Sequence, residues 1–162
     1  MKATQTEIDK ALDLLTDTPR RMAAAIQGLE DDQLHLRPDK KTWSVNDNLA
    51  HLRACADVWG ETIAAMLQED EPALKHISPR TWLKKTNYPE LPFQESYQDF
   101  VDQRRRLLQA LNDLTFAEWS RGAMIKDRRH TIFSQARRMA LHEVNHCQQI
   151  EALVAILASQ QG

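Results

Sequence analysis

Cysteines and glycines are scarce in this sequence, and long apolar segments are missing. Cys55 and Cys147 are the only cysteines among 162 residues, which excludes a small fold held together by disulfides. No apolar run reaches the roughly 18 to 20 residues of a membrane-spanning helix, and the first residues lack the apolar stretch of a signal peptide. We therefore expect a soluble cytoplasmic protein with reduced cysteines and no membrane partner.

An excess of charge of one sign is also missing. The 21 basic residues nearly balance the 23 acidic ones, giving a net charge of −2. Proteins that bind nucleic acid through its phosphates carry a basic patch or stripe, so we expect no nucleic-acid partner. The length is that of one domain of ordinary size, which we place at residues 1–162.

Apolar residues recur at helical spacing in four segments. These segments are residues 4–29, 44–69, 93–114 and 131–157. Within the first of them, Pro19 either kinks one helix or begins a second, and the sequence favours neither. Four prolines mark residues 70–92 as a long connection. The pattern predicts an all-α fold, a four-helix bundle with a long crossover loop between its second and third helices.

Several conspicuous side chains are expected to be structural. Arg104, Arg105 and Arg106 are consecutive and should form a solvated face, because adjacent residues of a helix point in different directions. His35, His76 and His130 fall in predicted loops and should lie at the surface. The four tryptophans are expected to anchor the core or the loops, and they are Trp43, Trp59, Trp82 and Trp119.

The predicted fourth helix contains a histidine pair. His142 and His146 are four residues apart, so their imidazoles lie on one face and can reach the same metal ion. The segment also matches the HExxH pattern of zinc proteases. That interpretation lacks a third ligand, because only 16 residues follow His146 and their single acid, Glu151, lies off the ligand face. We therefore reject it.

A better third ligand is His51, in the first half of the predicted second helix. One inward histidine from this helix and the pair from the fourth can form a three-histidine site in a bundle. Three neutral imidazoles leave the charge of a divalent ion largely uncompensated and a coordination position open. Imidazole ligands suit several metals, and we expect Zn or Ni, with Fe and Mn as alternatives.

The order of these motifs resembles the DinB/YfiT-like superfamily. The resemblance lies in Leu34, Arg37, Pro38, Trp43, Ser44, Val45, Leu49, Ala50, His51, Leu52, His142, Glu143, His146, Gln149 and Ile150. It covers nearly the whole chain, from about residue 19 to 157. It implies a four-helix bundle, a divalent metal held by His51, His142 and His146, and a homodimer.

The resemblance also implies an activity. Relatives include transferases and isomerases that use low-molecular-weight thiols such as glutathione, mycothiol or bacillithiol. We therefore expect a metal-dependent enzyme that acts on a small molecule by activating a thiol cosubstrate or water, with thiol transfer ahead of hydrolysis. The alternative is a bundle without activity, whose metal is structural or vestigial and whose surface serves protein association.

Four further residues are candidates to support the ligands or a substrate. Cys55 lies one turn after His51 and could approach the metal, although a core position is the simpler interpretation. Asn48 and Gln149 lie about one turn from ligands and could hydrogen-bond an imidazole or the substrate. Glu143 points about 100° away from His142, so we expect it to orient another group or lie at an interface rather than act as a base.

Overall fold

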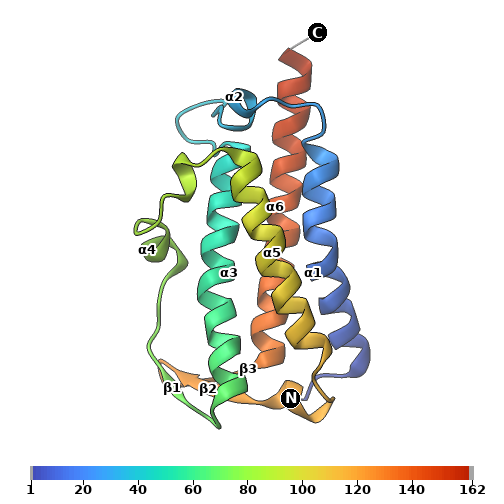
Figure 1. Cartoon of the computed structure of the whole chain (residues 1–162), viewed down its shortest axis with the longest axis vertical. Helices are drawn as coiled ribbons and strands as arrows, with labels where there is room; N and C mark the ends of the chain where they lie inside the picture. The colour runs from blue at the N-terminus through green and yellow to red at the C-terminus, as the bar shows by residue number, and fades with distance from the viewer. Residues whose placement is uncertain (1, 161–162) are drawn as a thin grey trace.

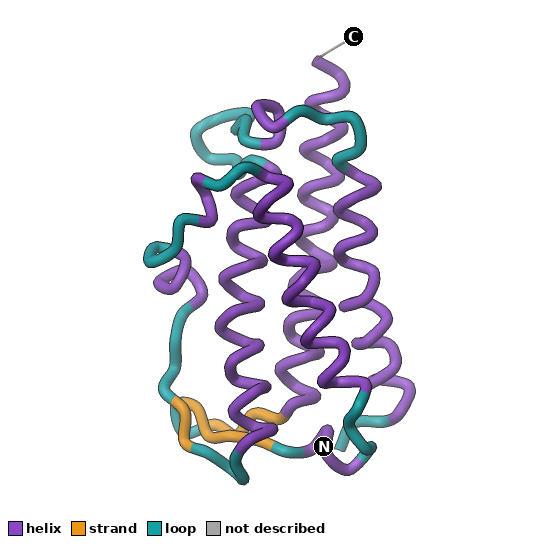
Figure 2. Tube along the Cα trace, viewed as in Figure 1, coloured by secondary structure: helices purple, strands orange, loops and turns teal. Residues whose placement is uncertain are grey.

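The computed structural model describes residues 2–160 and shows four long helices packed side by side (Figure 1). They are α1 (Gln5–Ala25), α3 (Val45–Gln68), α5 (Phe93–Asn112) and α6 (Ile132–Gln160). Helix α6 packs against both α1 and α3. Figure 2 shows the long connection between α3 and α5 running along the outside of the bundle. The predicted four-helix bundle with a long crossover is therefore confirmed.

Shorter elements occupy the connections between the long helices. They are α2 (Asp31–Leu34), β1 (Ala73–Leu74), α4 (Pro79–Leu83), the 3-10 helices η1 (Tyr88–Glu90) and η2 (Ala117–Ser120), β2 (Gly122–Ile125) and β3 (Arg128–Thr131). The sequence predicts loops in these regions, so the three strands are an addition to a mostly helical chain. His76 is exposed as expected, whereas His35 ends α2 and His130 lies on β3, both half-buried.

The three strands form one small sheet at the end of the bundle, in the order β1-β2-β3. Strand β1 pairs with β2 in parallel, and β2 pairs with β3 in antiparallel fashion. The β2–β3 turn contains Lys126 and Asp127 at φ 48° and 61°, the left-handed conformation that tight hairpins require. Gly122 has no substitute, because a Cβ atom there would lie 2.5 Å from the carbonyl oxygen of His130.

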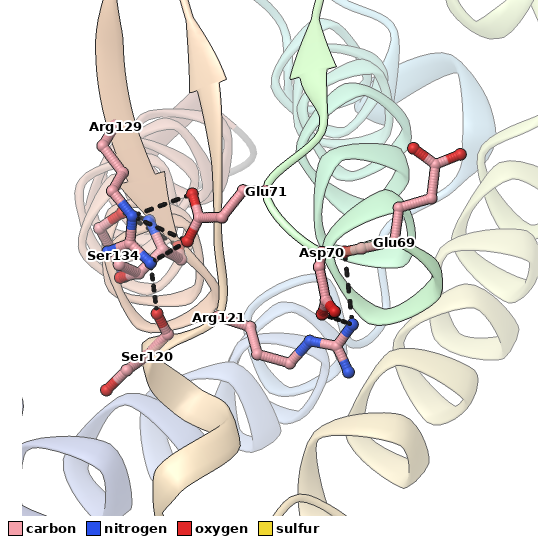
Figure 3. Close-up of polar contacts among 8 residues, drawn as sticks. Glu69, Asp70, Glu71, Ser120, Arg121, Arg129 and Ser134 are labelled. Atoms are coloured by element: carbon pink, nitrogen blue, oxygen red, sulfur yellow. Dashed lines mark hydrogen bonds and ion pairs between the residues drawn. The ribbon is translucent and has the colours of Figure 1, made fainter.

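Two arginines connect this sheet to the chain that follows α3 (Figure 3). Arg129 donates to the Glu71 carboxylate and, at 2.9 Å, to the carbonyl oxygen of Ser120. Arg121 lies 3.4 Å from Asp70. Both arginines and their acidic partners are largely at the surface, so each pair stabilises the fold only slightly. Their effect is to hold the start of the crossover against β2 and β3.

Helix α1 continues through Pro19, which answers the question that the sequence left open. A proline inside a helix has no N–H to donate to the carbonyl four residues earlier, here that of Leu15. The Arg104 guanidinium of α5 replaces the missing donor, with its Nη1 atom 2.7 Å from the Leu15 oxygen. The helix thus keeps its course because a side chain of a neighbouring helix completes its hydrogen bonding.

The expectation that the arginine run is solvated is wrong for one of its members. Arg105 and Arg106 are exposed, whereas Arg104 is only 3% exposed. Its guanidinium forms an ion pair with Glu143 of α6, which is 1% exposed. The Thr18 hydroxyl donates to the same carboxylate at 2.8 Å. Burial of a charge requires such a partner, and this network connects α1, α5 and α6.

Helix α3 begins where the sequence predicts. The Ser44 hydroxyl accepts a hydrogen bond from the Asp47 backbone N–H, and the Asp47 carboxylate accepts one from the Ser44 N–H, both at 2.9 Å. This reciprocal cap satisfies two N–H groups that would otherwise lack partners at the helix start. It fixes the first turn of α3, and therefore the direction in which Asn48 and His51 project one and two turns later.

The core consists of two clusters of buried apolar side chains along the bundle. Cys55 and Cys147 are both buried and unpaired, in keeping with their predicted role as small core residues. None of the helices among residues 2–160 combines the length and the apolar character needed to cross a membrane.

Candidate metal centre

Three histidine side chains from two helices meet inside the bundle. His51 projects from α3, and His142 and His146 project from successive turns of α6. The Nε2 atom of His142 lies 3.2 Å from that of His51 and 3.1 Å from that of His146. Each residue offers a nitrogen within 4.8 Å of the other two. The structure therefore brings together the three residues that the sequence predicts as ligands.

The spacing of these nitrogens suits a shared metal ion. Nitrogens bound at roughly 2.0 to 2.1 Å, with angles of about 90 to 109° between them, are roughly 2.9 to 3.4 Å apart. The two closest Nε2 separations, 3.1 and 3.2 Å, lie in this range. An Nε2–H of one neutral imidazole can donate to the lone pair of a second, but it cannot point at both neighbours, so the third nitrogen is left without a partner. A cation among the three would satisfy all of them.

Asn48 fixes the orientation of one imidazole. Its Oδ1 atom lies 2.8 Å from His146 Nδ1, and its own amide donates to the Ser44 carbonyl at 2.9 Å. The Asn48 oxygen can only accept, so His146 carries its proton on Nδ1 and presents the lone pair of Nε2 to the cluster. Among residues 2–160, the Nδ1 atoms of His51 and His142 have no hydrogen-bond partner.

The environment keeps the three imidazoles neutral. Burial, and then the charge of His142, lower the pKa of His51 from 6.5 to about 4. The same two causes lower the pKa of His146 to about 4. Burial also lowers the pKa of His142, against the opposing charge of Glu143. Neutral imidazole is the form that binds a metal, so all three side chains are in the form that a ligand needs near neutral pH.

These pKa values predict an acid-sensitive metal-free protein. Unfolded histidines take up protons near pH 6.5, whereas folded His51 and His146 do so near pH 4. Between these values the unfolded state binds more protons, so the free energy of unfolding should fall as the pH is lowered from about 6.5 to about 4. Urea titrations of the metal-free protein at several pH values measure this fall. The double variant His51→Gln/His146→Gln should show a smaller fall, and an identical fall would contradict the assignment.

A cavity of about 600 Å³ opens onto the three histidines. Trp43 and Arg80 line it together with Gln149, one of the predicted supporting residues. The Trp43 ring stacks on His146 with centroids 6.1 Å apart. The expectation of a purely structural Trp43 therefore misses its place in the site. The sequence does not predict that Arg80 lines this cavity, because Arg80 lies in the crossover and not on a helix that carries a ligand.

Cys55 lies beside the cluster but is not one of its three members. Its Sγ atom is 3.6 Å from His51 Nε2. Burial, and then the Glu143 charge, raise the pKa of the Cys55 thiol to about 12. Because the thiolate is the nucleophilic form, burial disfavours a nucleophilic role for this thiol. The burial of Cys55 agrees with the role of a small core residue.

Glu143 follows a ligand in sequence but turns away from the cavity. Its carboxylate accepts from Arg104 of α5 at 2.9 Å and from Thr18 of α1 at 2.8 Å. A general base must lie within hydrogen-bond reach of the proton that it removes. Glu143 instead holds α6, and the two histidines on it, against the other helices.

Comparisons with known proteins agree with this architecture. The sequence pattern of the DinB superfamily matches residues 14–150, a range that includes all three histidines. Among solved structures, the chain is similar to YfiT from Bacillus subtilis, described as a probable metal-dependent hydrolase with an unusual four-helix bundle topology. The two share 20% identity and superpose with a TM-score of 0.78 over 97% of this chain and 91% of YfiT. No functionally curated protein matches the sequence. Because the family match extends over most of its length, the chain belongs to the DinB superfamily.

Proposed function

We propose that the protein is a metal-dependent enzyme that activates water or a thiol for attack on a small electrophilic molecule. The observation that carries this proposal is the convergence of three neutral imidazoles at the wall of an open cavity. Structural metal sites are closed by four protein ligands, whereas catalytic ones keep a position for water or substrate. Three ligands and an adjoining cavity fit the second kind.

Residues of the chain have different roles at this site. His51, His142 and His146 would hold a divalent ion, with Zn or Ni preferred and Fe or Mn as alternatives. The ion, when bound, lowers the pKa of a water or thiol beside it and so supplies a nucleophile near neutral pH. Asn48 orients His146, and the Trp43 ring offers a flat apolar surface next to the ligands.

Two nucleophiles are compatible with this arrangement. YfiT, a structure of the same fold, is described as a probable metal-dependent hydrolase, which supports water. The superfamily that the sequence resembles also includes transferases and isomerases that use a low-molecular-weight thiol such as glutathione, mycothiol or bacillithiol, which supports a thiol. We rank thiol transfer ahead of hydrolysis, since Arg80 and Lys41 line the cavity and would attract the carboxylates that glutathione carries.

A paired assay tests the proposal. Metal-loaded and chelated protein are compared in the hydrolysis of activated esters and in the conjugation of each thiol to a small electrophile. Chelation should abolish turnover and leave the far-ultraviolet circular dichroism largely unchanged, because the two apolar clusters hold the bundle without the ion. Loss of helicity on chelation, or a lack of metal-dependent turnover with every substrate, would favour a structural metal in a bundle that serves protein association.

We also propose that the protein is a homodimer, as the resemblance implies. Apolar side chains outside the intrachain core support this, among them Leu141 and Ile156 of α6, which are 40% and 42% exposed. Covering such side chains is favourable because it removes apolar surface from water. Sedimentation velocity at tens of micromolar protein should therefore give the mass of a dimer. The mass of a monomer at that concentration would reject the proposal.

A further inference from the structure

A second cavity lies next to the metal centre and shares no lining residue with it. It has a volume of about 520 Å³ and lies between the second half of α3, the crossover, the β2–β3 hairpin and the start of α6. Trp59 lines this cavity and faces His142 on the other side, with ring centroids 5.2 Å apart. Cavities that hold small molecules have volumes of about 300 to 1,000 Å³.

The walls of this cavity are aromatic and aliphatic. The indoles of Trp59 and Trp82 form part of the wall, together with Leu74, Ile77 and Ile125. Trp82 is held in place because its Nε1 atom donates to Asp57 at 2.9 Å. Fixed indole faces favour a flat apolar ligand, because such a ligand buries a large area at little cost in side-chain entropy.

Cations line the cavity without acidic partners. Lys75, Lys126, Arg128 and Arg138 contribute to the lining, and none forms an ion pair within residues 2–160. Burial, and then the charges of Arg128 and Arg138, lower the pKa of His130, which places both guanidinium groups near this histidine. Arg138 also lies over the Trp59 ring, with its Cζ atom 4.7 Å from the centroid. Positive charge therefore gathers beside the aromatic wall.

The two acids of the lining compensate only part of this charge. The Asp57 carboxylate accepts hydrogen bonds from the side chains of Trp82, Tyr88 and Gln103, which hold it in place. Glu61 and the four cations are exposed to solvent, so their charges are screened alike. Two acids thus face four cations, and the lining keeps an excess of positive charge.

The side-chain amide of Gln135 is open to the cavity. Gln135 is only 2% exposed and lines the cavity, and its amide forms no hydrogen bond with another group among the residues that the structure describes. A polar group of a ligand would satisfy it.

We propose that this cavity binds a small organic anion with a flat apolar body, an aromatic carboxylate in class. The indole faces pack against the apolar body, Arg128 and Arg138 bind the carboxylate, and the Gln135 amide hydrogen-bonds a remaining polar atom. Arginine is suited to this task because its planar guanidinium binds a carboxylate through two parallel hydrogen bonds. The site is independent of the metal centre and of the function proposed for it.

The test titrates metal-loaded protein with 2-naphthoate and follows the four indole N–H signals by NMR, assigned with Trp→Phe variants. The Trp82 signal should shift saturably, whereas the Trp43 signal, which reports on the metal centre, should stay in place. Neutral 2-naphthamide, which has the same ring system, should bind at least about tenfold more weakly, because it loses the charge-assisted contacts. A chelated sample should give the same affinity for 2-naphthoate.

Matched variants locate the anion. Arg128→Gln/Arg138→Gln should weaken 2-naphthoate binding at least about tenfold, with helicity unchanged. Arg137 lies on the same helix as Arg138 and is exposed, but it does not line the cavity. Arg137→Gln should therefore leave the affinity for 2-naphthoate unchanged. Equal binding of the amide, an unchanged affinity in the double variant, a shift of Trp43 in place of Trp82, or no binding at millimolar 2-naphthoate would each overturn the proposal.

Discussion

Alanine in place of His142 is expected to remove stoichiometric binding of a divalent ion. The Nε2 atom of His142 lies 3.2 and 3.1 Å from those of His51 and His146, so the substitution removes the member of the cluster that contacts both others. Loss of a residue that only orients a ligand costs about 10- to 100-fold in affinity. Loss of a ligand should therefore cost at least about 100-fold.

Competition with a chromophoric chelator measures this change, and elemental analysis of protein purified without added metal measures occupancy. His51→Ala and His146→Ala should behave as His142→Ala does, and Asn48→Ala should weaken binding by about 10- to 100-fold. The matched control is His76→Ala, because His76 is exposed in the crossover. An unchanged stoichiometry and affinity in the variant that lacks all three histidines would refute the site.

Glutamine in place of Glu143 is expected to destabilise the fold strongly and to affect catalysis only weakly. The substitution leaves the Arg104 guanidinium buried without a compensating charge, which typically costs about 3 to 5 kcal/mol of unfolding free energy. The catalytic rate per folded molecule should stay within about tenfold, because the carboxylate faces α1 and α5. Loss of a general base would lower it by roughly 10²- to 10⁴-fold.

Urea denaturation gives the stability change, and kcat/KM measured well below the melting temperature gives the rate. Arg104→Met should destabilise to a similar extent, whereas Arg105→Met, next to it on an exposed face, should stay within about 0.5 kcal/mol of the original protein. The double variant Arg104→Met/Glu143→Leu should recover much of the loss, because no charge remains buried. A rate reduced a hundredfold in folded Glu143→Gln would instead identify Glu143 as a base.

The helix faces on which the three histidines lie could be predicted because local rules determine them. His142 and His146 share a face through the helical repeat, and the Ser44 cap sets the start of α3 and hence the direction of His51. The length and order of the long helices follow from the same apolar repeat. These features depend on residues a few positions apart, so the sequence alone contains them.

Other features depend on contacts between distant segments. Helical geometry requires three consecutive arginines to point in different directions, but only the position of Glu143 on another helix decides that Arg104 is the buried one. Strand β1 has two residues, too few for a periodic signal. The cavity beside Trp59 is assembled from four separate segments. No local pattern predicts which of these segments will meet.

The donor that Arg104 provides to the Leu15 carbonyl has an evolutionary consequence. Position 19 needs this external donor only while it is proline, since any other residue would supply its own N–H to Leu15. In a relative without this proline, the guanidinium would no longer need to donate to the carbonyl of residue 15. In a relative that keeps the proline but lacks the arginine, this buried carbonyl would have no donor. Substitutions at positions 19, 104 and 143 should therefore be correlated among relatives, although the three residues lie on three different helices.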